Sequence, residues 1–390
     1  MVILRLAVRN IIGAGLRTWL SVIVLSLSFV IIIWHKGLLD GWDRQAINDM
    51  IKWEVAGGQY WNSKFDPYDP LSLAEAHGTI PFQMEELIDK GDATAFLYTQ
   101  GTIYPKGRLQ SILIKGIDPD QSIIDLPSEE LSKGDAEIPA LIGMNMSVSS
   151  GLKKGDLVTL RWRDRNGAFD AARVYINGVF QTNVPGVDNS QIWIPLDKLQ
   201  DMILTPGEAT IIVCRERDMA YPVVEGWVFK SRDDLFVDLN KIIKSKTMAG
   251  LIIWAILLMV AMLAIFDTQV LSIFRRQREI GTYVALGMTR RQVVSLFTIE
   301  GTMHSVLAAF VGAAYGIPLL SMQATRGISL PVSTKDYGLA MAEKLFPVYS
   351  LGLVLGTVLI VLLVTTIVSY WPSRKIAKMR PTEALRGRIQ

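Results

Sequence analysis

The stretch TMAGLIIWAILLMVAMLAIF, residues 247–266, runs for 20 residues without a charged side chain. A helix that crosses the hydrocarbon core of a bilayer needs about 20 mainly apolar residues, with a range of roughly 17 to 25. Three further uncharged runs of 18, 25 and 29 residues lie at 18–35, 301–325 and 345–373. A buried helix of a soluble protein is the alternative for runs of roughly 10 to 14 residues, and these four are longer. We therefore expect four membrane-spanning helices.

The composition of the 390 residues supports this class: 50% are hydrophobic and 20% are charged, whereas an average soluble chain is about 25% charged. The charges are missing from the four runs and occur at ordinary density elsewhere, so a sizeable part of the chain faces water. The apolar content excludes a disordered chain, and a single cysteine excludes a disulfide scaffold. The near balance of 40 basic and 37 acidic residues excludes a general nucleic-acid binder.

The first apolar run has a second interpretation, as a secretory signal peptide with residues 20–33 as its core. Such a peptide should end in small residues at a cleavage site, but the sequence continues as Ile33-Trp34-His35-Lys36-Gly37. Trp34 is typical of a helix anchored at the membrane interface. We therefore favour an uncleaved helix.

Basic residues gather in three segments beside the apolar runs. They are Arg5, Arg9 and Arg17; Arg275, Arg276, Arg278, Arg290 and Arg291; and Arg374, Lys375, Lys378, Arg380, Arg386 and Arg388. These segments hold 14 basic and 2 acidic residues, whereas the rest of the chain holds 26 basic and 35 acidic ones. Short loops rich in Lys and Arg remain in the cytoplasm. Both termini and the middle loop are therefore expected inside, and the two remaining loops outside.

The expected fold is an α-helical membrane protein with four transmembrane helices and a large mixed α/β extracytoplasmic domain between the first two. The expected order is a basic cytoplasmic segment at 1–17, a span at 18–39, the periplasmic domain at 40–246, a span at 247–274, a cytoplasmic loop at 275–291, a span at 292–323, a short outer loop at 324–345, a span at 346–372 and a basic cytoplasmic tail at 373–390.

The large outer domain shows β-rich runs, which predict strands at 111–117, 157–162, 173–180, 191–194 and 210–214. Asn166-Gly167 between two of these runs is a strong hairpin signal. Residues 83–90 and 196–203 are helical candidates. These patterns predict a mixed α/β domain.

No catalytic set emerges from this domain, because His35, His77 and His304 are scattered and no HExxH or GxSxG motif occurs. Cys214 is expected as a small buried apolar side chain. Four aromatic residues after the first run are expected in core or interface packing, with an apolar substrate groove as the alternative; they are Trp42, Trp53, Tyr60 and Trp61.

The loop RRQREIGTYVALGMTRRQ, residues 275–292, carries the most specific pattern. Residues 277–286 suit a short amphipathic helix, with Ile280, Val284 and Tyr283 on one face. Gly281 would destabilise that helix by about 1 kcal/mol, which makes sense if another backbone must approach closely there.

The end of this helix and the start of the next also have sequence signals. Gly287 can end the helix in a left-handed cap, and Thr289 to Gln292 has the spacing of a capping box. A role as topology determinants would explain the arginines but not this helix–glycine–cap order. The pattern therefore predicts a basic helical hairpin that docks a cytoplasmic partner.

The loop and its continuation to residue 301 resemble the signature stretch of the ABC-transporter permeases of the MacB, LolC/LolE and FtsX superfamily. The tail PSRKIAKMRPTEALR, residues 372–386, is similar to the closing pattern of that family. LIG at 141–143, followed by GLKKGD at 151–156, resembles a recurring turn of its outer domain. The layout of one span, a large outer domain and three spans matches as well.

The resemblance implies roles for particular residues. The loop would be the coupling helix that docks into a groove of the ATPase, through Arg278, Glu279, Ile280, Gly281, Ala285, Leu286, Gly287, Arg290 and Arg291. The tail motif would comprise Arg374, Lys375, Pro381, Glu383, Ala384, Leu385 and Arg386. Residues 1–17 would form an amphipathic elbow along the inner face of the membrane. The first two spans would form the dimer interface and, in lipoprotein-releasing members, the lipid-binding cleft.

Nucleotide chemistry is expected from another polypeptide, because the Walker motif GxxxxGK[ST] is missing and no Gly-Lys dipeptide occurs in the sequence. The chain is thus expected to be no enzyme, with no metal or cofactor of its own; ATP and magnesium would bind to the partner ATPase. Further expected partners are a second permease, as a copy or a related chain, membrane lipids and a periplasmic carrier or adaptor.

The expected function is that of a permease subunit in the bacterial inner membrane, which couples ATP hydrolysis to motion of the outer domain. The spans contain almost no ionisable residue apart from Asp267, which argues against a hydrophilic pathway. Release of lipoproteins ranks first, efflux of amphiphilic drugs or peptides second, and control of a cell-wall hydrolase third.

A membrane sensor is a separate alternative, but it predicts a signalling module after residue 274, where two more spans follow instead. A membrane-embedded enzyme would need an acid–base pair or nucleophile, and none is visible.

Overall fold

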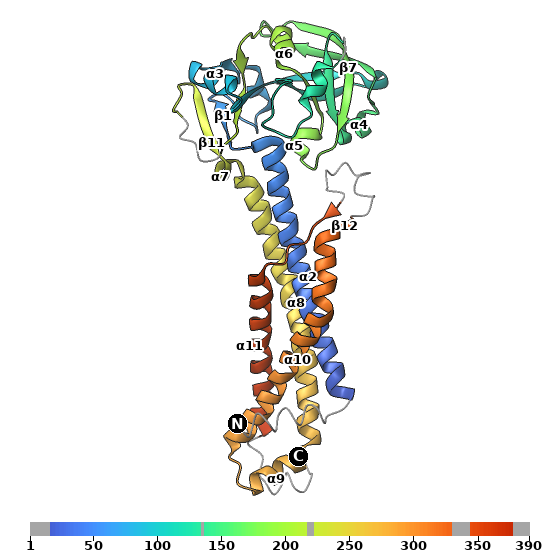
Figure 1. Cartoon of the computed structure of the whole chain (residues 1–390), viewed down its shortest axis with the longest axis vertical. Coiled ribbons are helices and arrows are strands. Elements are labelled where there is room, and N and C mark those ends of the chain that lie inside the picture. The colour runs from blue at the N-terminus through green and yellow to red at the C-terminus, as the bar shows by residue number, and fades with distance from the viewer. Residues whose placement is uncertain (1–15, 134–135, 217–221, 330–343, 377–390) are drawn as a thin grey trace. The chain divides into compact units, whose positions relative to one another are not determined.

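The computed structural model describes residues 16–133, 136–216, 222–329 and 344–376. The chain divides into two compact units. The helical unit comprises residues 1–42, 243–328 and 345–390, and the sheet unit comprises residues 43–242 and 329–344. Each unit is described by itself (Figure 1).

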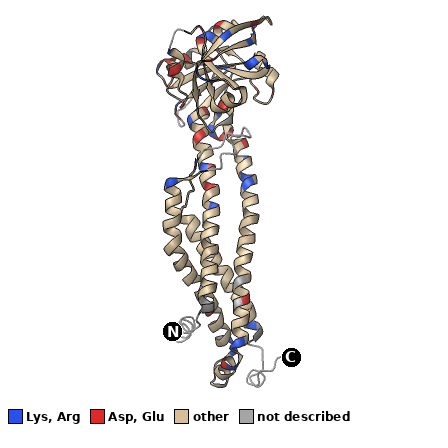
Figure 2. Cartoon of the chain, turned by 90° about the vertical axis from the view of Figure 1, so that its right-hand side faces the viewer, with Lys and Arg blue, Asp and Glu red and all other residues tan. Residues whose placement is uncertain are grey.

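Within the described residues, four helices are long and apolar enough to cross a membrane. They are α2 (Leu16–Met50), α8 (Val237–Arg275), α10 (Arg290–Arg326) and α11 (Leu351–Ile376). Figure 2 shows that charged residues gather near the ends of these helices and leave long uncharged stretches between them. The prediction of four apolar helices is confirmed.

The helices differ in length from the predicted spans. α2 and α8 extend beyond their apolar runs through charged residues, since charge ends a hydrophobic run but not helical hydrogen bonding. Lys36 and Asp40, one turn apart in α2, form an ion pair at 2.8 Å. α11 begins at Leu351, five residues later than predicted, because Pro347 disfavours helical geometry in the residue before it.

Side chains of all four helices meet in one apolar cluster: Val22, Leu25, Phe29, Ile265, Ala308, Val361 and Val368. Small residues bring the helix backbones close together, as is common between membrane helices. A methyl group at Gly312 of α10 would lie 3.3 Å from the carbonyl oxygen of Ser26 in α2. One at Gly301 would collide with Ser369 of α11.

The sheet unit contains a nine-stranded sheet with the order β11-β1-β10-β3-β4-β8-β5-β7-β6. Its strands are β1 (Gly58–Asn62), β3 (Ala93–Ile103), β4 (Gln110–Ile117), β5 (Pro139–Gly143), β6 (Leu157–Arg163), β7 (Phe169–Phe180), β8 (Gln191–Pro195), β10 (Ile211–Cys214) and β11 (Trp227–Ser231). A further pairing of β3 with β6 closes six of these strands into a ring. Val158, Leu160 and Trp162 alternate with exposed residues along β6 and point into the ring's core.

Shorter elements complete the chain. The helices are α3 (Phe82–Asp89), α4 (Met144–Ser150), α5 (Pro185–Asp188), α6 (Leu196–Ile203), α7 (Arg232–Leu235) and α9 (Gln277–Ala285). η1 (Ile51–Val55) is a short π-helix, and η2 (Pro70–Ala74), η3 (Pro105–Gly107) and η4 (Ser128–Ser132) are short 3₁₀ helices. The short strands are β2 (Gly78–Thr79), β9 (Glu208–Ala209), β12 (Ile328–Ser329) and β13 (Lys344–Leu345).

The five predicted strands correspond to β4, β6, β7, β8 and β10, and both helical candidates are present as α3 and α6. The hairpin signal is confirmed: β6 and β7 pair antiparallel, and Gly167 has a φ of +85°. Cys214 has 0% exposure, as predicted. Tyr60 is buried and Trp53 stacks on Phe180, which fits core packing.

Candidate docking loop between the second and third long helices

The loop between α8 and α10 is a short capped helix. α9 follows Arg276, and the turn after it contains Gly287, which has a φ of +99°. That conformation is strained for any residue with a side chain, which explains the glycine. Thr289 and Gln292 form a capping box at the start of α10: the backbone nitrogen of Thr289 donates to Gln292 Oε1 at 2.8 Å. The predicted amphipathic helix, glycine turn and capping box are all confirmed.

One face of α9 packs against the chain itself. Ile280 is 5% exposed and joins an apolar cluster whose buried members are Ile273, Ile280, Val293 and Phe297, with Val284 and Met288 packed against it. Gly281 is also buried. Two of the nine residues assigned to the docking surface, Ile280 and Gly281, therefore hold α9 in place and are not available to a partner that approaches from outside.

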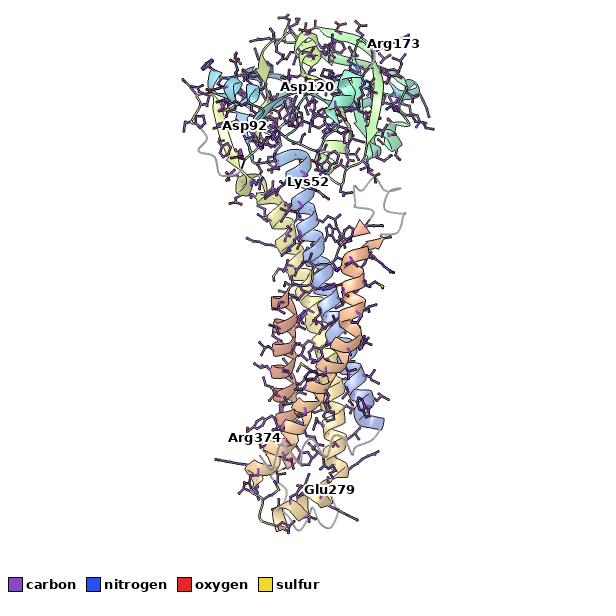
Figure 3. The ribbon with its side chains drawn as sticks, in the orientation of Figure 1. Lys52, Asp92, Asp120, Arg173, Glu279 and Arg374 are labelled. Carbon is purple, nitrogen blue, oxygen red and sulfur yellow. The ribbon has the colours of Figure 1, made fainter. Side chains whose placement is uncertain are left out.

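The other seven residues face solvent. They are Arg278, Glu279, Ala285, Leu286, Gly287, Arg290 and Arg291. Leu286 is 79% exposed. Figure 3 shows Glu279 on α9, at the end of the helical unit where α8 and α10 meet the loop. The loop thus presents an exposed leucine among arginines.

An ion pair that sequence reasoning missed lies behind this loop. Arg276 Nη1 donates to both carboxylate oxygens of Glu300, at 2.8 and 2.9 Å, and Arg276 Nε donates to Glu279 Oε2 at 2.6 Å. The guanidinium also lies over the Phe297 ring, 5.1 Å from its centre. The sequence signal was the position of Glu300, whose lone carboxylate directly precedes the third apolar run.

The tail motif is only partly described. Arg374 lies near the end of α11 and is exposed (Figure 3), and the backbone of Lys375 continues that helix. Pro381, Glu383, Ala384, Leu385 and Arg386 lie outside the described residues, as do residues 1–15 of the expected elbow. The loop between α8 and α10 is therefore the part of the candidate site that the structure describes in full.

Within the described ranges, no three His, Cys, Asp or Glu side chains gather closely enough to hold a metal ion. His77 belongs to a small network in the sheet unit, where Glu208 bonds both His77 Nδ1, at 2.5 Å, and Arg165 Nη1, at 2.9 Å. His304 is buried in α10, and its Nδ1 donates to the carbonyl oxygen of Glu300 at 2.7 Å. Each of these two histidines thus has a structural partner.

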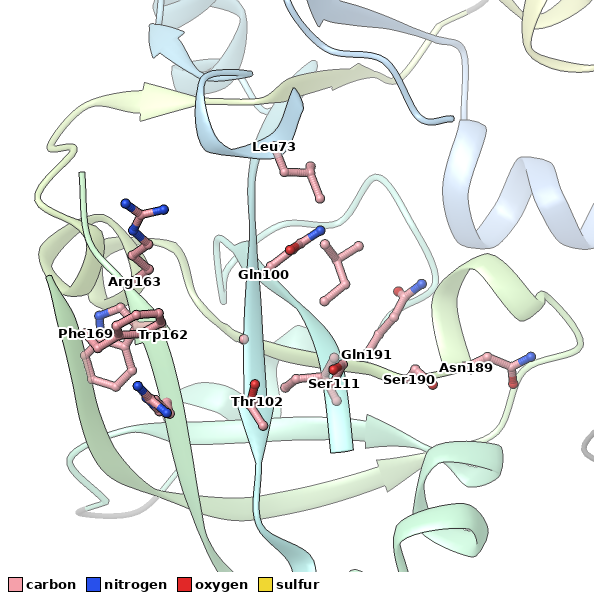
Figure 4. A pocket seen from close by; sticks show the side chains of 14 residues that line it. Leu73, Gln100, Thr102, Ser111, Trp162, Arg163, Phe169, Asn189, Ser190 and Gln191 are labelled. Atoms are coloured by element: carbon pink, nitrogen blue, oxygen red, sulfur yellow. The ribbon is translucent and has the colours of Figure 1, made fainter. Parts of the chain in front are cut away.

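The sheet unit carries two larger hollows. One, of about 770 Å³, is lined by polar side chains of β3, β4, β6 and β8 together with Arg161, Arg163 and Phe169 (Figure 4). The other, of about 720 Å³, is lined in part by Trp61, Phe65 and Tyr68. Trp61, one of the four aromatic residues noted in the sequence, lines the second hollow, and Lys246 lies over the ring of Trp42 at 4.6 Å.

The long apolar helices, with a short capped helix between two of them, are typical of a multi-pass membrane protein. Residues 251–381 match the family model described as FtsX-like permease C-terminal. That match runs from α8 through the loop to residues just beyond α11. The chain is thus similar to the MacB, LolC and FtsX superfamily of ABC-transporter permeases.

Several curated relatives support the assignment. The chain is 29% identical to an uncharacterized ABC transporter permease of Methanocaldococcus jannaschii over 133 residues, 34% of this chain and 31% of that protein. It is 26% identical to the macrolide export protein MacB of Sodalis glossinidius over 235 residues, 55% of this chain and 33% of that protein. It is 23% identical to the lipoprotein-releasing transmembrane protein LolC of Neisseria meningitidis over 332 residues, 75% and 77% of the two chains. The chain thus spans about a third of the first two relatives.

Proposed function

We propose that this chain is the permease subunit of an ABC transporter, and that it passes the work of ATP hydrolysis from a separate cytoplasmic ATPase to its outer domain. The observation that carries this proposal is the outward face of α9, in a chain similar to this superfamily. A capped helix that presents Leu286 among basic residues suits insertion into a groove of a partner with an apolar floor and acidic walls.

The proposal assigns nucleotide binding to the partner. The 390 residues contain no Gly-Lys dipeptide, so the phosphate-binding lysine of a Walker motif is not among them. ATP and Mg²⁺ would bind to the ATPase, and this chain would contribute no catalytic residue. Its own role is mechanical: it receives a displacement at α9 and moves its helices.

The proposed location is the bacterial inner membrane, with α9 and both termini in the cytoplasm and the sheet unit in the periplasm. α8 leaves most of its apolar side chains exposed, among them Leu251, Ile252, Ile256, Met259 and Leu263. Such a surface favours contact with lipid tails and with a second permease, either a copy or a related chain. A periplasmic carrier or adaptor would complete the route.

Lipoproteins are the proposed cargo. The LolC relatives of Neisseria meningitidis and Xylella fastidiosa, named as parts of a lipoprotein-releasing system, align over 77% and 86% of their own lengths. Alignments to the MacB relatives of Sodalis glossinidius and Rhodopirellula baltica cover 33% and 18% of those proteins. Efflux of amphiphilic drugs or peptides is the second candidate, favoured by the hollow that Trp61, Phe65 and Tyr68 help to line.

The test is to replace Leu286 with aspartate in the tagged full chain and to measure capture of the ABC ATPase from its host's membranes. Leu286 is 79% exposed, so Leu286→Asp should leave the fold intact while it puts a charge into the partner's groove. We expect captured ATPase to fall at least about tenfold, the equivalent of 1.4 kcal/mol of binding free energy.

The matched control is Val223→Asp, which puts the same charge on a fully exposed apolar residue of the sheet unit. It should leave capture unchanged. Equal capture by the wild-type chain and Leu286→Asp would show that α9 is not the docking element.

A further inference from the structure

Arg276 occupies the joint between two helices. It is the residue between the end of α8 and the start of α9, and its backbone, with φ −99° and ψ 18°, departs from helical geometry. The chain therefore changes direction at Arg276. Whatever holds its side chain also fixes the direction in which α9 leaves α8.

The side chain of Arg276 reaches away from its own helices to α10. Two of its three hydrogen bonds go to Glu300, and its guanidinium covers the ring of Phe297, one turn earlier in the same helix. Its third bond goes to Glu279 of α9. One guanidinium thus connects the α8–α9 joint, the first turn of α9 and α10.

The two carboxylates that Arg276 binds differ in their surroundings. The side chain of Glu300 is 6% exposed, whereas that of Glu279 is 55% exposed. Ion pairs in contact with water are screened and weak, whereas removal of one partner from a buried pair leaves an uncompensated charge. The bond to Glu300 is therefore the one that holds the joint.

The polar contacts continue from Glu300 toward α11. His304 Nδ1 bonds the carbonyl oxygen of Glu300, and Gly301 lies directly against Ser369 of α11. One residue further along, the hydroxyl groups of Thr302 and Thr366 lie 3.0 Å apart and share a hydrogen bond. A displacement of α10 at Glu300 is consequently passed to the part of α11 around Thr366 and Ser369.

We infer that the buried Arg276–Glu300 ion pair is the link through which a force on α9 reaches α10 and α11. This inference rests on the proposed function, because it takes α9 as the element that the ATPase moves. Arg276 and Glu300 are positioning residues: they touch neither nucleotide nor cargo, and they act by keeping α9 and α10 in a fixed relation. Without the pair, α9 would still bind the ATPase, but it would swing on its joint instead of pushing α10.

The first measurement is hydrogen exchange of the α9 amides in the full chain, reconstituted into lipid nanodiscs without any partner. Glu300→Gln keeps the shape of the side chain and removes its charge, and Arg276→Gln removes the other charge. In both variants we expect the α9 amides to exchange at least about tenfold faster, because local opening becomes easier. The double variant Arg276→Glu with Glu300→Arg, in which the two charges are swapped, should bring the hydrogen-exchange rate of the α9 amides back toward the wild-type value.

The control is Arg326→Gln, which removes an exposed arginine from the other end of α10. It should leave α9 exchange as it is in the wild type. Unchanged α9 exchange in both single variants would overturn the inference. The inference would also be overturned if hydrogen exchange became faster evenly through α10 and α11 and the double variant with swapped charges did not reverse this. That pattern would mean a general loss of stability.

The second measurement separates transmission from docking. In Glu300→Gln we expect capture of the ABC ATPase to stay within about threefold of wild type. The ATP turnover of the complete transporter, per captured ATPase, should be lower by about tenfold or more. Equal turnover in wild type and Glu300→Gln would overturn the inference while the proposed function stands. If the wild-type chain itself captures no ATPase, the proposed function fails. Transmission of force through the Arg276–Glu300 pair then fails with it. This holds even if hydrogen exchange shows that the pair fixes α9.

Discussion

The ammonium group of Lys115 is buried in the sheet unit between the rings of Tyr98 and Trp193, 4.8 Å from the centre of each. It donates a hydrogen bond to the carbonyl oxygen of Gly186 at 3.0 Å. Burial lowers the pKa of Lys115 to about 8, although the carboxylate of Glu54 opposes the shift. Aromatic faces and one carbonyl thus stabilise a cation that the interior disfavours.

This burial predicts that the sheet unit becomes more stable as the pH rises from about 8 toward 10. The usual lysine pKa is 10.5, so in this range the unfolded chain keeps a proton that the folded chain has released. The free energy of unfolding then increases with pH, by about 1.4 kcal/mol per pH unit at most. Urea unfolding of the full chain, followed by tryptophan fluorescence at several pH values, measures this slope.

Lys115→Met is the control for the lysine prediction, since methionine fills the same space without a charge. Its unfolding free energy should change less between pH 8 and 10 than that of the wild type. Above pH 10 both proteins should lose stability, because burial raises the pKa of Tyr98 well above 10 and ionisation of the unfolded tyrosine then favours unfolding. Parallel slopes for the two proteins between pH 8 and 10 would contradict the prediction.

At the scale of elements, the capped loop between α8 and α10 was predictable because its signals are local. The apolar spacing of Ile280 and Val284, the glycine at 287 and the Thr289–Gln292 box each act over a few residues. The Arg276–Glu300 pair was not predictable in this way, since it joins residues 24 positions apart through the packing of two helices. Burial of Gly281 within the chain likewise depends on that packing.

Within the nine-stranded sheet, the strands that sequence analysis missed are β1, β3, β5 and β11. β3 and β5 consist largely of buried residues and lack the alternation that marks a strand with one wet face. β1, with the sequence GQYWN, contains residues that are uncommon in strands, and pairing on both sides imposes its conformation. Alternation was informative for β6, whose outer face is in solvent.

Close packing of α2 leads to a prediction about Gly41. A methyl group at Gly41 would collide with the carbonyl oxygen of Phe346 and lie 2.9 Å from Pro347 Cα, so backbone atoms would have to move. We expect Gly41→Ala to reduce the stability of the helical unit by about 1–3 kcal/mol, the usual cost of overpacking. Thermal unfolding in nanodiscs measures the loss.

Gly356 in α11 provides the comparison for Gly41, because nothing lies within 4 Å of a methyl group there. Gly356→Ala should keep or raise stability, since alanine favours helix over glycine by about 1 kcal/mol. Equal effects of the two substitutions would mean that the contact of α2 with residues 346–347 contributes nothing.

At the scale of the whole molecule, the distribution of charge leads to the proposed orientation. In the sequence the three basic segments adjoin the apolar runs, and the sheet unit contains most of the acidic residues. We expect a cysteine that replaces Asn166, in the exposed β6–β7 turn, to react with a membrane-impermeant maleimide in spheroplasts. One that replaces Thr282, on the exposed side of α9, should react only after the membrane is permeabilised.

Cys214 has 0% exposure and should not react in either case, so the chain without added cysteines supplies the background signal. Reaction of the Thr282 position in intact spheroplasts, or failure of the Asn166 position to react there, would reverse the proposed orientation.

The order of strands in the sheet has a consequence for biosynthesis. β1 pairs with β10 and β11, so that Gly58 lies opposite both Cys214 and Ser231. Such distant contacts form slowly, because a long loop must close before they form. A ribosome that has produced β1 must therefore translate roughly 150 more residues before the first of its neighbours exists. Until then both edges of β1 lack their strand partners, so the nascent domain exposes unpaired backbone N–H and C=O groups.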